Sequence, residues 1–425
     1  MEGNVRRSLD AFLAARGPEL IALRRELHAH PEPGHAEYRT THMIAERLTA
    51  AGLTPVILPK GTGLLADISM GSGGNAVALR ADLDALPMDD EKDVPYRSTV
   101  PGACHACGHD VHTVVLLGAG LFLAEQARAG LLPGPVRLIF QPAEEPGTGA
   151  QEVIAAGGLE SVGRIFALHC DPRLDVGTLG VRSGAITAAC DHIKVQVAGP
   201  GGHTARPHLT ADVVYALGKI VTELPAALSR RVDPRSSLSL VWGRISAGSA
   251  ANAIPDEGIA EGTVRCLDDE AWQAAPGLVD ELIRSVAGAY GVTAELSYLR
   301  NVPPTVNEAA SAMMFASAAE SVLGPDGVTP AQQSLGGEDF AWYLSSVPGA
   351  LARLGTRTPG GADSDLHRPS FDVDERAIGA GVRVMVAAAL TALWHGTAAP
   401  GSSEILEPTQ SRGRGSLAGA AEGER

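Results

Sequence analysis

The sequence predicts an α/β protein whose mixed, mostly parallel sheet is interrupted by an inserted α+β module. Two patterns lead to this prediction. In the first half of the chain, short β-rich segments alternate with helical segments, as in a parallel sheet with crossover helices. From residue 188 the order becomes β-α-β-β-α-β, which is the order of a ferredoxin-like module.

The elements of the sheet follow two expected amphipathic helices at the start of the chain. These helices cover residues 18–30 and 37–51, and a Pro31, Pro33 and Gly34 cluster separates them. The expected strands are residues 76–80, 136–141 and 164–169, and the expected helices are 110–127 and 149–156. Ligands of such sheets lie beyond the carboxyl ends of the strands, so we expect a site where polar motifs follow these strands.

The inserted module and the end of the chain complete the organisation. The module is expected to contain strands 192–198, 236–245, 258–267 and 292–299 with helices 209–229 and 270–289, and a long helix follows at 374–393. We therefore predict one discontinuous domain formed by residues 1–187 and 301–398, with an insertion at 188–300. Residues 399–425 are rich in Gly, Ser and Pro and are predicted to be a disordered tail.

Composition excludes several classes of partner. The 425 residues are 45% hydrophobic and 20% charged, with a formal net charge of −15. This balance argues against a nucleic-acid partner and against attraction to an anionic membrane face. The start lacks the apolar run of a secretory signal, and the apolar stretch near 114–124 is too short to span a bilayer. We expect a cytoplasmic protein.

Residues 104–112 (CHACGHDVH) contain the densest group of metal-ligand side chains. Cys107 and His109 lie two positions apart, so a thiolate and an imidazole can reach one divalent ion. A zinc ribbon would need a second C-x-x-C, which the chain lacks, whereas a redox role for Cys104 and Cys107 remains an alternative. The odd number of cysteines, 5, does not indicate a disulfide framework.

Two adjacent carboxylates, Glu144 and Glu145, follow the expected strand 136–141. In an extended segment their side chains point to opposite sides, so one can bind a metal while the other faces the water that the metal polarises. An ordinary acidic loop is the alternative. Asp82, His169 and His367 also lie in polar segments at strand ends or loops, and each is ambiguous alone.

The chain resembles the peptidase M20 family through a set of motifs in a fixed order. These motifs are RADLDALP, HACGHDVHT, FQPAEEPG, ALH, GGHTARPH, NAIPDE, GGEDFAWYL and LHRPSFDVDE. The set is similar to the amidohydrolase branch, which includes hippurate hydrolases, N-acetyl-diaminopimelate deacetylases and auxin-conjugate hydrolases. The resemblance implies a zinc-peptidase-like α/β/α catalytic domain that holds two divalent ions (zinc, manganese, nickel or cobalt) and an inserted lid that forms a homodimer.

The resemblance also implies a role for each matching residue. Glu144 would be the general base, and Asp82 would orient a ligand from behind. Arg265 would assist Asn252 in binding substrate, and His203 would stabilise the oxyanion, in a dimer at the partner's site. The implied metal ligands are Cys107, His109, Glu145, His169 and His367.

The reaction implied by this resemblance is hydrolysis of the amide bond of an N-acyl amino acid, or a related small amide conjugate, to a carboxylic acid and a free amine. A metal-dependent dipeptidase or aminopeptidase is the alternative among hydrolases, and it would need a group that pairs with a free α-amine. A non-catalytic metal-binding protein or a thiol redox protein is the alternative from another class.

Overall fold

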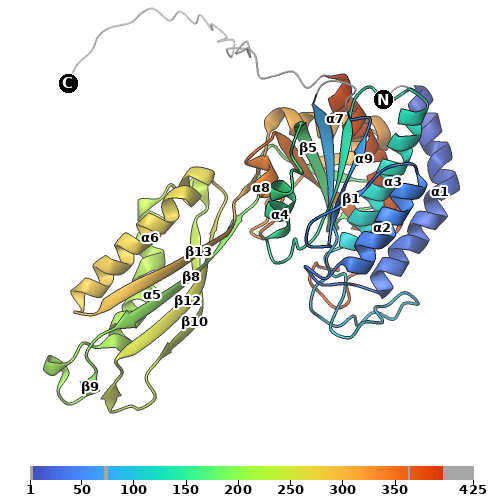
Figure 1. The fold of residues 1–425 in the computed structure, drawn as a ribbon. Helices are drawn as coiled ribbons and strands as arrows, with labels where there is room; N and C mark the ends of the chain where they lie inside the picture. Colours follow the sequence, from blue (N-terminus) through green and yellow to red (C-terminus); the bar gives the residue numbers. More distant parts are fainter. Residues whose placement is uncertain (1–2, 71–74, 362–363, 396–425) are drawn as a thin grey trace, which may run out of the picture.

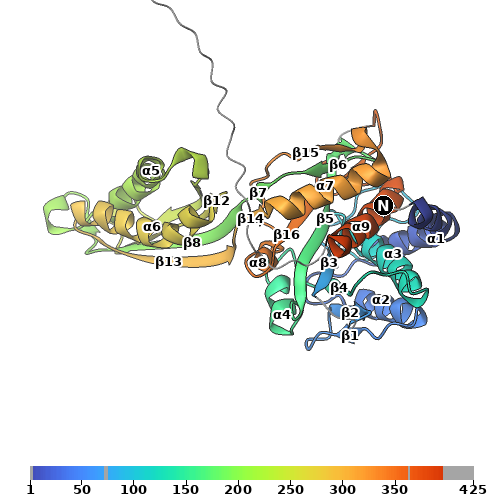
Figure 2. The same ribbon diagram turned by 90° about the horizontal axis from the view of Figure 1, so that it is seen from above.

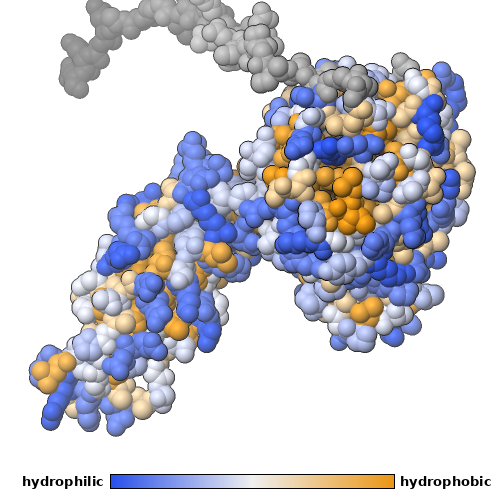
Figure 3. Space-filling view, viewed as in Figure 1, coloured by the Kyte–Doolittle hydropathy of each residue, from blue (hydrophilic) through white to orange (hydrophobic). Residues whose placement is uncertain are grey.

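The structure is a computed structural model that describes residues 3–70, 75–361 and 364–395. It shows a larger unit built on an eight-stranded sheet and a smaller unit built on a four-stranded sheet (Figure 1). The space-filling view shows the two units as distinct bodies that meet at one end of the smaller one (Figure 3). The predicted disordered tail, residues 399–425, lies outside the described residues.

The larger sheet has the strand order β1-β2-β4-β3-β5-β16-β6-β15. Its four central strands β4, β3, β5 and β16 run parallel, whereas β1, β2 and β6 pair antiparallel with their inner neighbours. The mostly parallel sheet predicted from the sequence is thereby confirmed. The strands are β1 Val56–Ile57, β2 Leu64–Ile68, β3 Ala76–Asp82, β4 Val136–Gln141, β5 Val162–Asp175, β6 Leu179–Val181, β15 Val328–Pro330 and β16 Gly349–Arg357.

Helices cover both faces of this sheet, so the larger unit has three layers (Figure 2). Every residue of β3 and β4 is buried, as expected for strands enclosed on both faces. The helices of one face are α1 Gly3–Ala29, α2 Tyr38–Ala50, α3 His109–Arg128, α7 Ala309–Leu323 and α9 Arg376–Trp394. The helices of the other face are α4 Gly149–Ala155 and α8 Ala341–Leu344.

Helix α1 starts earlier than residue 18, where the sequence pattern predicts that it begins. It begins at Gly3 and continues through Pro18, because Leu9 and Phe12 extend the buried face toward the N-terminus. Packing of this apolar face thus outweighs the hydrogen bond that a proline inside a helix cannot make. The expected helix began too late by about four turns.

Helix α9 is, among the described residues, the one helix whose length and composition match a membrane span. Its most apolar window is 67% buried within the larger unit. Its side chains pack against α3 and α7, and Gly381 lies so close to α3 that an added Cβ would meet Val115 at 2.7 Å. These contacts are those of a core helix.

The smaller unit spans residues 189–302 and follows the β-α-β-β-α-β order. Its strands form an antiparallel sheet in the order β10-β12-β8-β13, and helices α5 and α6 pack on one face of it over a separate apolar core. A short ladder of β9 (Gly202–His203) and β11 (Ala253–Ile254) lies at the end remote from the larger unit (Figure 1). The main elements are β8 Ala189–Ala198, α5 Val213–Arg231, β10 Ser239–Ala247, β12 Glu257–Cys266, α6 Asp269–Ala289 and β13 Thr293–Val302.

A second ladder joins the two units. Strand β7 (Gly184–Thr187) carries the chain out of the larger unit, and β14 (Thr305–Asn307) carries it back and pairs antiparallel with β7. The buried hydroxyls of Thr187 and Thr305 are hydrogen bonded at 2.5 Å in this ladder. A cavity opens beside the junction, and its lining residues come from both units.

Candidate active site

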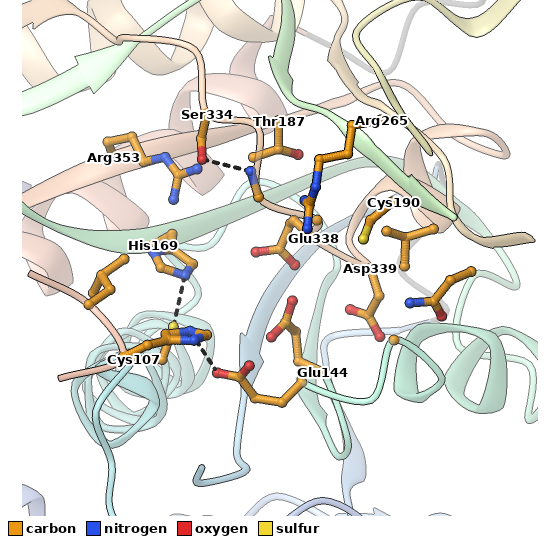
Figure 4. A pocket seen from close by; sticks show the side chains of 18 of the residues that line it. Cys107, Glu144, His169, Thr187, Cys190, Arg265, Ser334, Glu338, Asp339 and Arg353 are labelled. Carbon is orange, nitrogen blue, oxygen red and sulfur yellow. Dashed lines mark hydrogen bonds and ion pairs between the residues drawn. The ribbon is translucent and has the colours of Figure 1, made fainter. Parts of the chain in front are cut away.

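The carboxyl ends of β3 and β4, the start of α3 and the loop before α9 meet at one end of the parallel sheet. Beside them, at the junction of the two units, lies a cavity of about 430 Å³ (Figure 4). Its lining also includes the end of β5, the loop before α8 and residues of the smaller unit. Six predicted site residues line this cavity, and His109 is buried next to them. The six are Cys107, Glu144, Glu145, His169 and His367 of the larger unit and Arg265 of the smaller unit.

Cys107 is the centre of the donor group. The ligand atoms of Cys107, His109 and His169 lie within 4.8 Å of one another, and so do those of Cys107, Glu145 and His367. The Cys107 Sγ is 3.5 Å from the His169 Nε2, and the His367 Nε2 is 3.4 Å from the Glu145 Oε1. The Cys107 sulfur is therefore common to two overlapping donor sets.

The histidines are oriented by carbonyl groups on the side away from the cavity. Because a carbonyl only accepts, the Nδ1–H of His109 donates to the Asp84 oxygen at 2.8 Å, and the Nδ1–H of His169 donates to the Cys170 oxygen at 2.8 Å. With Nδ1 bound to a carbonyl, Nε2 is the ring nitrogen that remains for a metal ion in both histidines.

His367 is held by its backbone. Its φ of +58° lies in the left-handed region that non-glycine residues rarely adopt, and its N–H donates to the Ala106 carbonyl at 2.8 Å. The close approach of the Cys107 and Glu145 side chains raises the pKa of His367 to about 10. This strained loop residue is thus fixed directly above the segment that carries Cys107.

Two buried atoms show that the donor set fits metal ions. The His109 Nε2 and the Glu145 Oε1 have no hydrogen-bond partner among the described residues, and they lie 3.9 Å apart. Buried polar atoms are rarely left without a partner. A set of one thiolate, three imidazoles and a carboxylate suits borderline-soft divalent ions such as zinc. The residues therefore fit two divalent ions, and Cys107 would take part in holding both.

Asp82 acts on the site mainly through its neighbours. Its carboxylate accepts from the His112 Nδ1 at 2.6 Å and from the Arg80 Nη1 at 2.7 Å, whereas the His109 Nε2 is 3.7 Å away. His112 in turn accepts the Cys170 N–H through its Nε2 at 2.8 Å. Burial opposes charge on His109, but Asp82 and the Cys107 thiolate outweigh it and raise the His109 pKa.

The segment that carries Glu144 and Glu145 is a turn rather than the extended segment expected. The Gly147 N–H donates to the Glu144 carbonyl at 2.7 Å, and Gly147 has a φ of +76° that closes the turn. The Asp84 carboxylate accepts both N–H groups of the glutamate pair, each at 3.0 Å. The two side chains are separated by this clamped turn, not by strand alternation.

Glu144 sits in an acidic environment. Burial raises its pKa well above the ordinary range, and the Glu338 and Glu145 carboxylates add to this effect. Burial also raises the pKa of Asp339, to about 7. Arg80 holds this acidic group together, because its Nη2 contacts Glu338 at 3.2 Å and Asp339 at 2.8 Å. A carboxyl group with a raised pKa is suited to accept and return a proton near neutral pH.

The predicted residues of the smaller unit are not all brought to this cavity. Arg265, on β12, lines it and donates to the Leu335 carbonyl. His203 and Asn252 lie instead at the remote end, where His203 is exposed and pairs with Ala253. Within one chain, therefore, the structure does not place His203 or Asn252 at the site.

Sequence reasoning did not assign several residues that shape the cavity. Asp84 lies in the RADLDALP motif and Glu338 and Asp339 lie in GGEDF, so their acidic character beside a recognised motif was a signal. His112 lies in the cysteine and histidine segment and offered a similar signal. Arg353 had no such signal, because it lies in a strand, β16, that was not predicted.

Known proteins resemble the chain over most of its length. Residues 78–391 match the model of peptidase family M20/M25/M40. The chain is 39% identical to an N-acetyl-L-cysteine deacetylase of Bacillus subtilis, over 85% of this chain and 85% of that protein. A solved structure from Bacillus subtilis, a dinuclear metal-binding peptidase of the M20 family, is 34% identical with a TM-score of 0.79, over 90% of this chain and 99% of that one.

A further relative matches only in part. The chain is 48% identical to a Rhodococcus jostii protein whose name places it among glutamate–cysteine ligases, over 87% of this chain and 46% of that protein. The chain thus spans about half the length of this relative. The ligase activity named for that protein is therefore not assigned to this chain. The family match covers more than half of the chain and includes the segments that carry the donor set. The chain belongs to peptidase family M20/M25/M40.

Proposed function

We propose that this protein is a dinuclear-metal-dependent amidohydrolase that cleaves the amide bond of N-acyl amino acids. The observation that carries the proposal is the position of Glu144 next to two donor sets that share Cys107. In this arrangement Cys107, His109, Glu145, His169 and His367 hold the ions. A base of raised pKa lies next to them, at 3.9 Å between the Glu144 Oε2 and the His109 Nε2.

When bound, two divalent ions would polarise the acyl carbonyl and supply a water of lowered pKa. Glu144 takes the proton of the attacking water and returns it to the leaving amine. Asp84 keeps Glu144 in place through the backbone hydrogen bond at 3.0 Å, so the carboxylate enters the reaction already oriented. The products are a carboxylic acid and a free amino acid.

The substrate class rests on the relatives. One is named for deacetylation of N-acetyl-L-cysteine, and another, 33% identical over 84% of this chain and 82% of that protein, is an Arabidopsis thaliana hydrolase of auxin–amino acid conjugates. Both names describe an acyl group on the nitrogen of an amino acid. A small N-acyl amino acid is therefore the substrate class that we propose, in a cytoplasmic enzyme that binds neither nucleic acid nor membrane.

The oxyanion donor is proposed to come from a second copy of the chain. The Ala205 N–H donates to the His203 Nδ1 at 3.0 Å, so a neutral His203 carries its proton on Nε2 and can donate it. Since His203 lies remote from its own cavity, a homodimer formed through the smaller unit would bring it to the partner's site. Exposed apolar side chains on this unit support such an interface (Figure 3): Val241 and Leu299 are 62% and 65% exposed.

Replacement of Glu144 tests the proposed reaction. Glu144→Gln keeps the shape of the side chain but removes the proton acceptor, so turnover of N-acetyl amino acids should fall by on the order of 10²–10⁴-fold. Metal content, measured by mass spectrometry of purified protein, should stay at the wild-type level. Glu152→Gln, on nearby α4 and outside the cavity, is the matched control and should leave turnover unchanged.

The same assay separates the rival functions. Unchanged turnover in Glu144→Gln would refute its role as the base. Hydrolysis of dipeptides with no hydrolysis of N-acyl amino acids would identify a peptidase. Activity that survives removal of the metals by a chelator would favour thiol chemistry over the proposed hydrolysis.

A further inference from the structure

Arg353 is a buried arginine whose side chain points into the cavity. It lies on β16 directly opposite His169 of β5, and neighbours in register on parallel strands send their side chains to the same face. The residue is 6% exposed, and Figure 4 shows its guanidinium group directed between His169 and Ser334. Arg353 thus places a positive group beside the donor set.

The guanidinium group of Arg353 has no partner among the described residues. Its Nε is buried without a hydrogen bond, and no described carboxylate lies within ion-pair distance of the group. The carboxylates of Glu338 and Asp171 exert the strongest favourable charge effects on Arg353. However, the Asp171 carboxylate is bound by Arg173 at 2.8 Å, and the Glu338 carboxylate is bound by Arg80 at 3.2 Å. Burial accordingly lowers the pKa of Arg353 from its ordinary value.

Other buried arginines of the protein are all paired. Arg24 contacts Asp110 at 2.8 Å and Asp372 at 3.0 Å. Arg80 contacts Asp82 at 2.7 Å and Asp339 at 2.8 Å. A buried charge without a partner is costly, because it loses its hydration and gains nothing in exchange. The fold provides carboxylates for its structural arginines, so the unpaired Arg353 indicates an anion that arrives with the ligand.

The cavity already contains a second arginine. Arg265 lines the wall formed by the smaller unit, whereas Arg353 rises from the sheet of the larger unit. The family resemblance implies that Arg265 assists in binding the substrate, and a guanidinium at this wall of the cavity can pair with the α-carboxylate. An N-acyl amino acid with one carboxylate would then leave Arg353 unpaired, whereas a guanidinium pairs readily with a second carboxylate.

We propose that Arg353 is a substrate-binding residue that selects N-acyl amino acids with a second carboxylate. This inference rests on the proposed function and names its substrate class. Two parts of the substrate could carry this second carboxylate. It could belong to the acyl chain, as in an N-succinyl amino acid, or to the side chain of the amino acid, as in N-acetylglutamate. A neutral or monoanionic substrate would leave Arg353 without an anionic partner.

The test compares three substrates with the metal-loaded full chain: N-acetyl-L-leucine, N-acetyl-L-glutamate and N-succinyl-L-leucine. The wild type should hydrolyse one of the two dianionic substrates with a kcat/KM at least about tenfold above that of N-acetyl-L-leucine. The substrate that is preferred identifies the source of the second carboxylate. Equal or greater kcat/KM for N-acetyl-L-leucine would overturn the proposal.

Variants of Arg353 separate binding from structure. Arg353→Met should lower kcat/KM for the preferred dianionic substrate by about 10- to 100-fold, mainly through KM, and change that for N-acetyl-L-leucine by less than about threefold. Arg353→Lys should keep part of the preference, since it keeps the charge. Arg284→Met removes an exposed charge on α6, outside the cavity, and should have no effect. An equal loss for all substrates would overturn the selective role.

A binding measurement keeps this inference distinct from the proposed function. Calorimetric titration with succinate or glutarate, compared with propionate, should show tighter binding of the dicarboxylate to the wild type and loss of this difference in Arg353→Met. If no N-acyl amino acid is hydrolysed, the proposed function fails while this titration still decides the role of Arg353. If hydrolysis occurs but neither dicarboxylate binds more tightly than propionate, only the role of Arg353 fails.

Discussion

At the scale of single residues, the candidate site depends on side chains that hold the backbone behind the reacting groups. Glu37 is fully buried and accepts the Ala143 N–H at 2.7 Å, immediately before the turn of Glu144 and Glu145. Asp84 accepts the next two N–H groups along that turn. Two buried carboxyl groups thus fix three consecutive backbone N–H groups, which positions Glu144 through its backbone.

The buried Glu37 predicts a pH dependence of stability. Burial raises its pKa from 4.5 to about 7, so between these values the folded protein holds a proton that the unfolded chain has lost. This stabilisation is complete below pH 4.5 and is lost as the pH rises through about 7. Glu37→Gln keeps the acceptor for Ala143 without the charge, so its free energy of unfolding should rise relative to that of the wild type by up to about 3 kcal/mol between pH 5 and 8.

Urea denaturation of wild type and Glu37→Gln at pH 5 and pH 8 measures this difference. Glu46→Gln, an exposed position on the same helix α2, is the control and should follow the wild type. A wild type that loses no stability relative to Glu37→Gln over this range would contradict the assignment.

The residue scale also shows the limits of prediction from sequence. Cys107, His109, Glu144 and Glu145 stand out because ligand-type residues are crowded into short segments. Arg353 does not stand out, because its significance depends on lying opposite His169 in the sheet and on lacking a carboxylate partner. Such a relation between distant segments is invisible until the strands are paired.

At the scale of elements, the turn between β4 and α4 determines where the glutamate pair lies. Gly149, the first residue of α4, donates its N–H to the Ala143 carbonyl at 3.0 Å. A Cβ at this position would lie 1.6 Å from the Pro142 carbonyl oxygen and 2.9 Å from the Gln141 Nε2. Because a backbone carbonyl cannot rotate away as a side chain can, the turn itself would have to move.

Gly149→Ala is therefore expected to damage both stability and the metal site. Overpacking of this kind should lower the free energy of unfolding by about 1–3 kcal/mol and should reduce metal content, because Glu145 moves with the turn. Gly277→Ala, at an exposed position of α6 with open space around it, is the control and should be neutral or stabilising by about 0.4–1 kcal/mol. Full metal content in a stable Gly149→Ala would contradict the dependence of the site on this turn.

The elements were predictable where one pattern dominated. Strand β4 matches its expected bounds. The expected helix α3 is one residue too short at each end, and the expected helix α4 is one residue too long at its C-terminal end. Strand β5 was expected to end at His169 but continues to Asp175. It continues because β16 still pairs with it after β3 has separated at Ala167. The length of a strand follows from its neighbours, which the local sequence does not specify.

At the scale of the whole molecule, the remaining question is how His203 reaches a site. Mixing two inactive variants answers it. A Glu144→Gln chain supplies an intact His203, and a His203→Ala chain supplies an intact Glu144. If His203 acts at the site of the partner subunit, unfolding and refolding the two variants together should restore activity at about a quarter of the sites, because half of the dimers are mixed and each has one complete site.

Size-exclusion chromatography with light scattering should show a dimer for both variants and the wild type. Each variant refolded alone is the control and should remain inactive. A mixed sample with no restored activity, although mixed dimers form, would contradict action at the partner's site.

The sequence predicts an inserted module because the β-α-β-β-α-β order is distinct from the alternation around it. The relative placement of the units was not foreseeable, because it depends on the β7–β14 ladder and on Arg265, whose partner is the Leu335 carbonyl of the larger unit. The resemblance to the family gave the ligand set, and the structure adds the cavity in which both units take part.

The most direct test of the dinuclear centre is anomalous diffraction from crystals of the zinc-loaded protein, recorded at the zinc edge. Two peaks are expected on either side of the Cys107 Sγ, one near His169 and one near His367.

A second group of three donors, His28, Asp90 and Cys104, lies elsewhere, with the Lys92 ammonium 2.6 Å from the His28 Nε2. A single peak beside Cys107, or peaks only at the His28 group, would contradict the account.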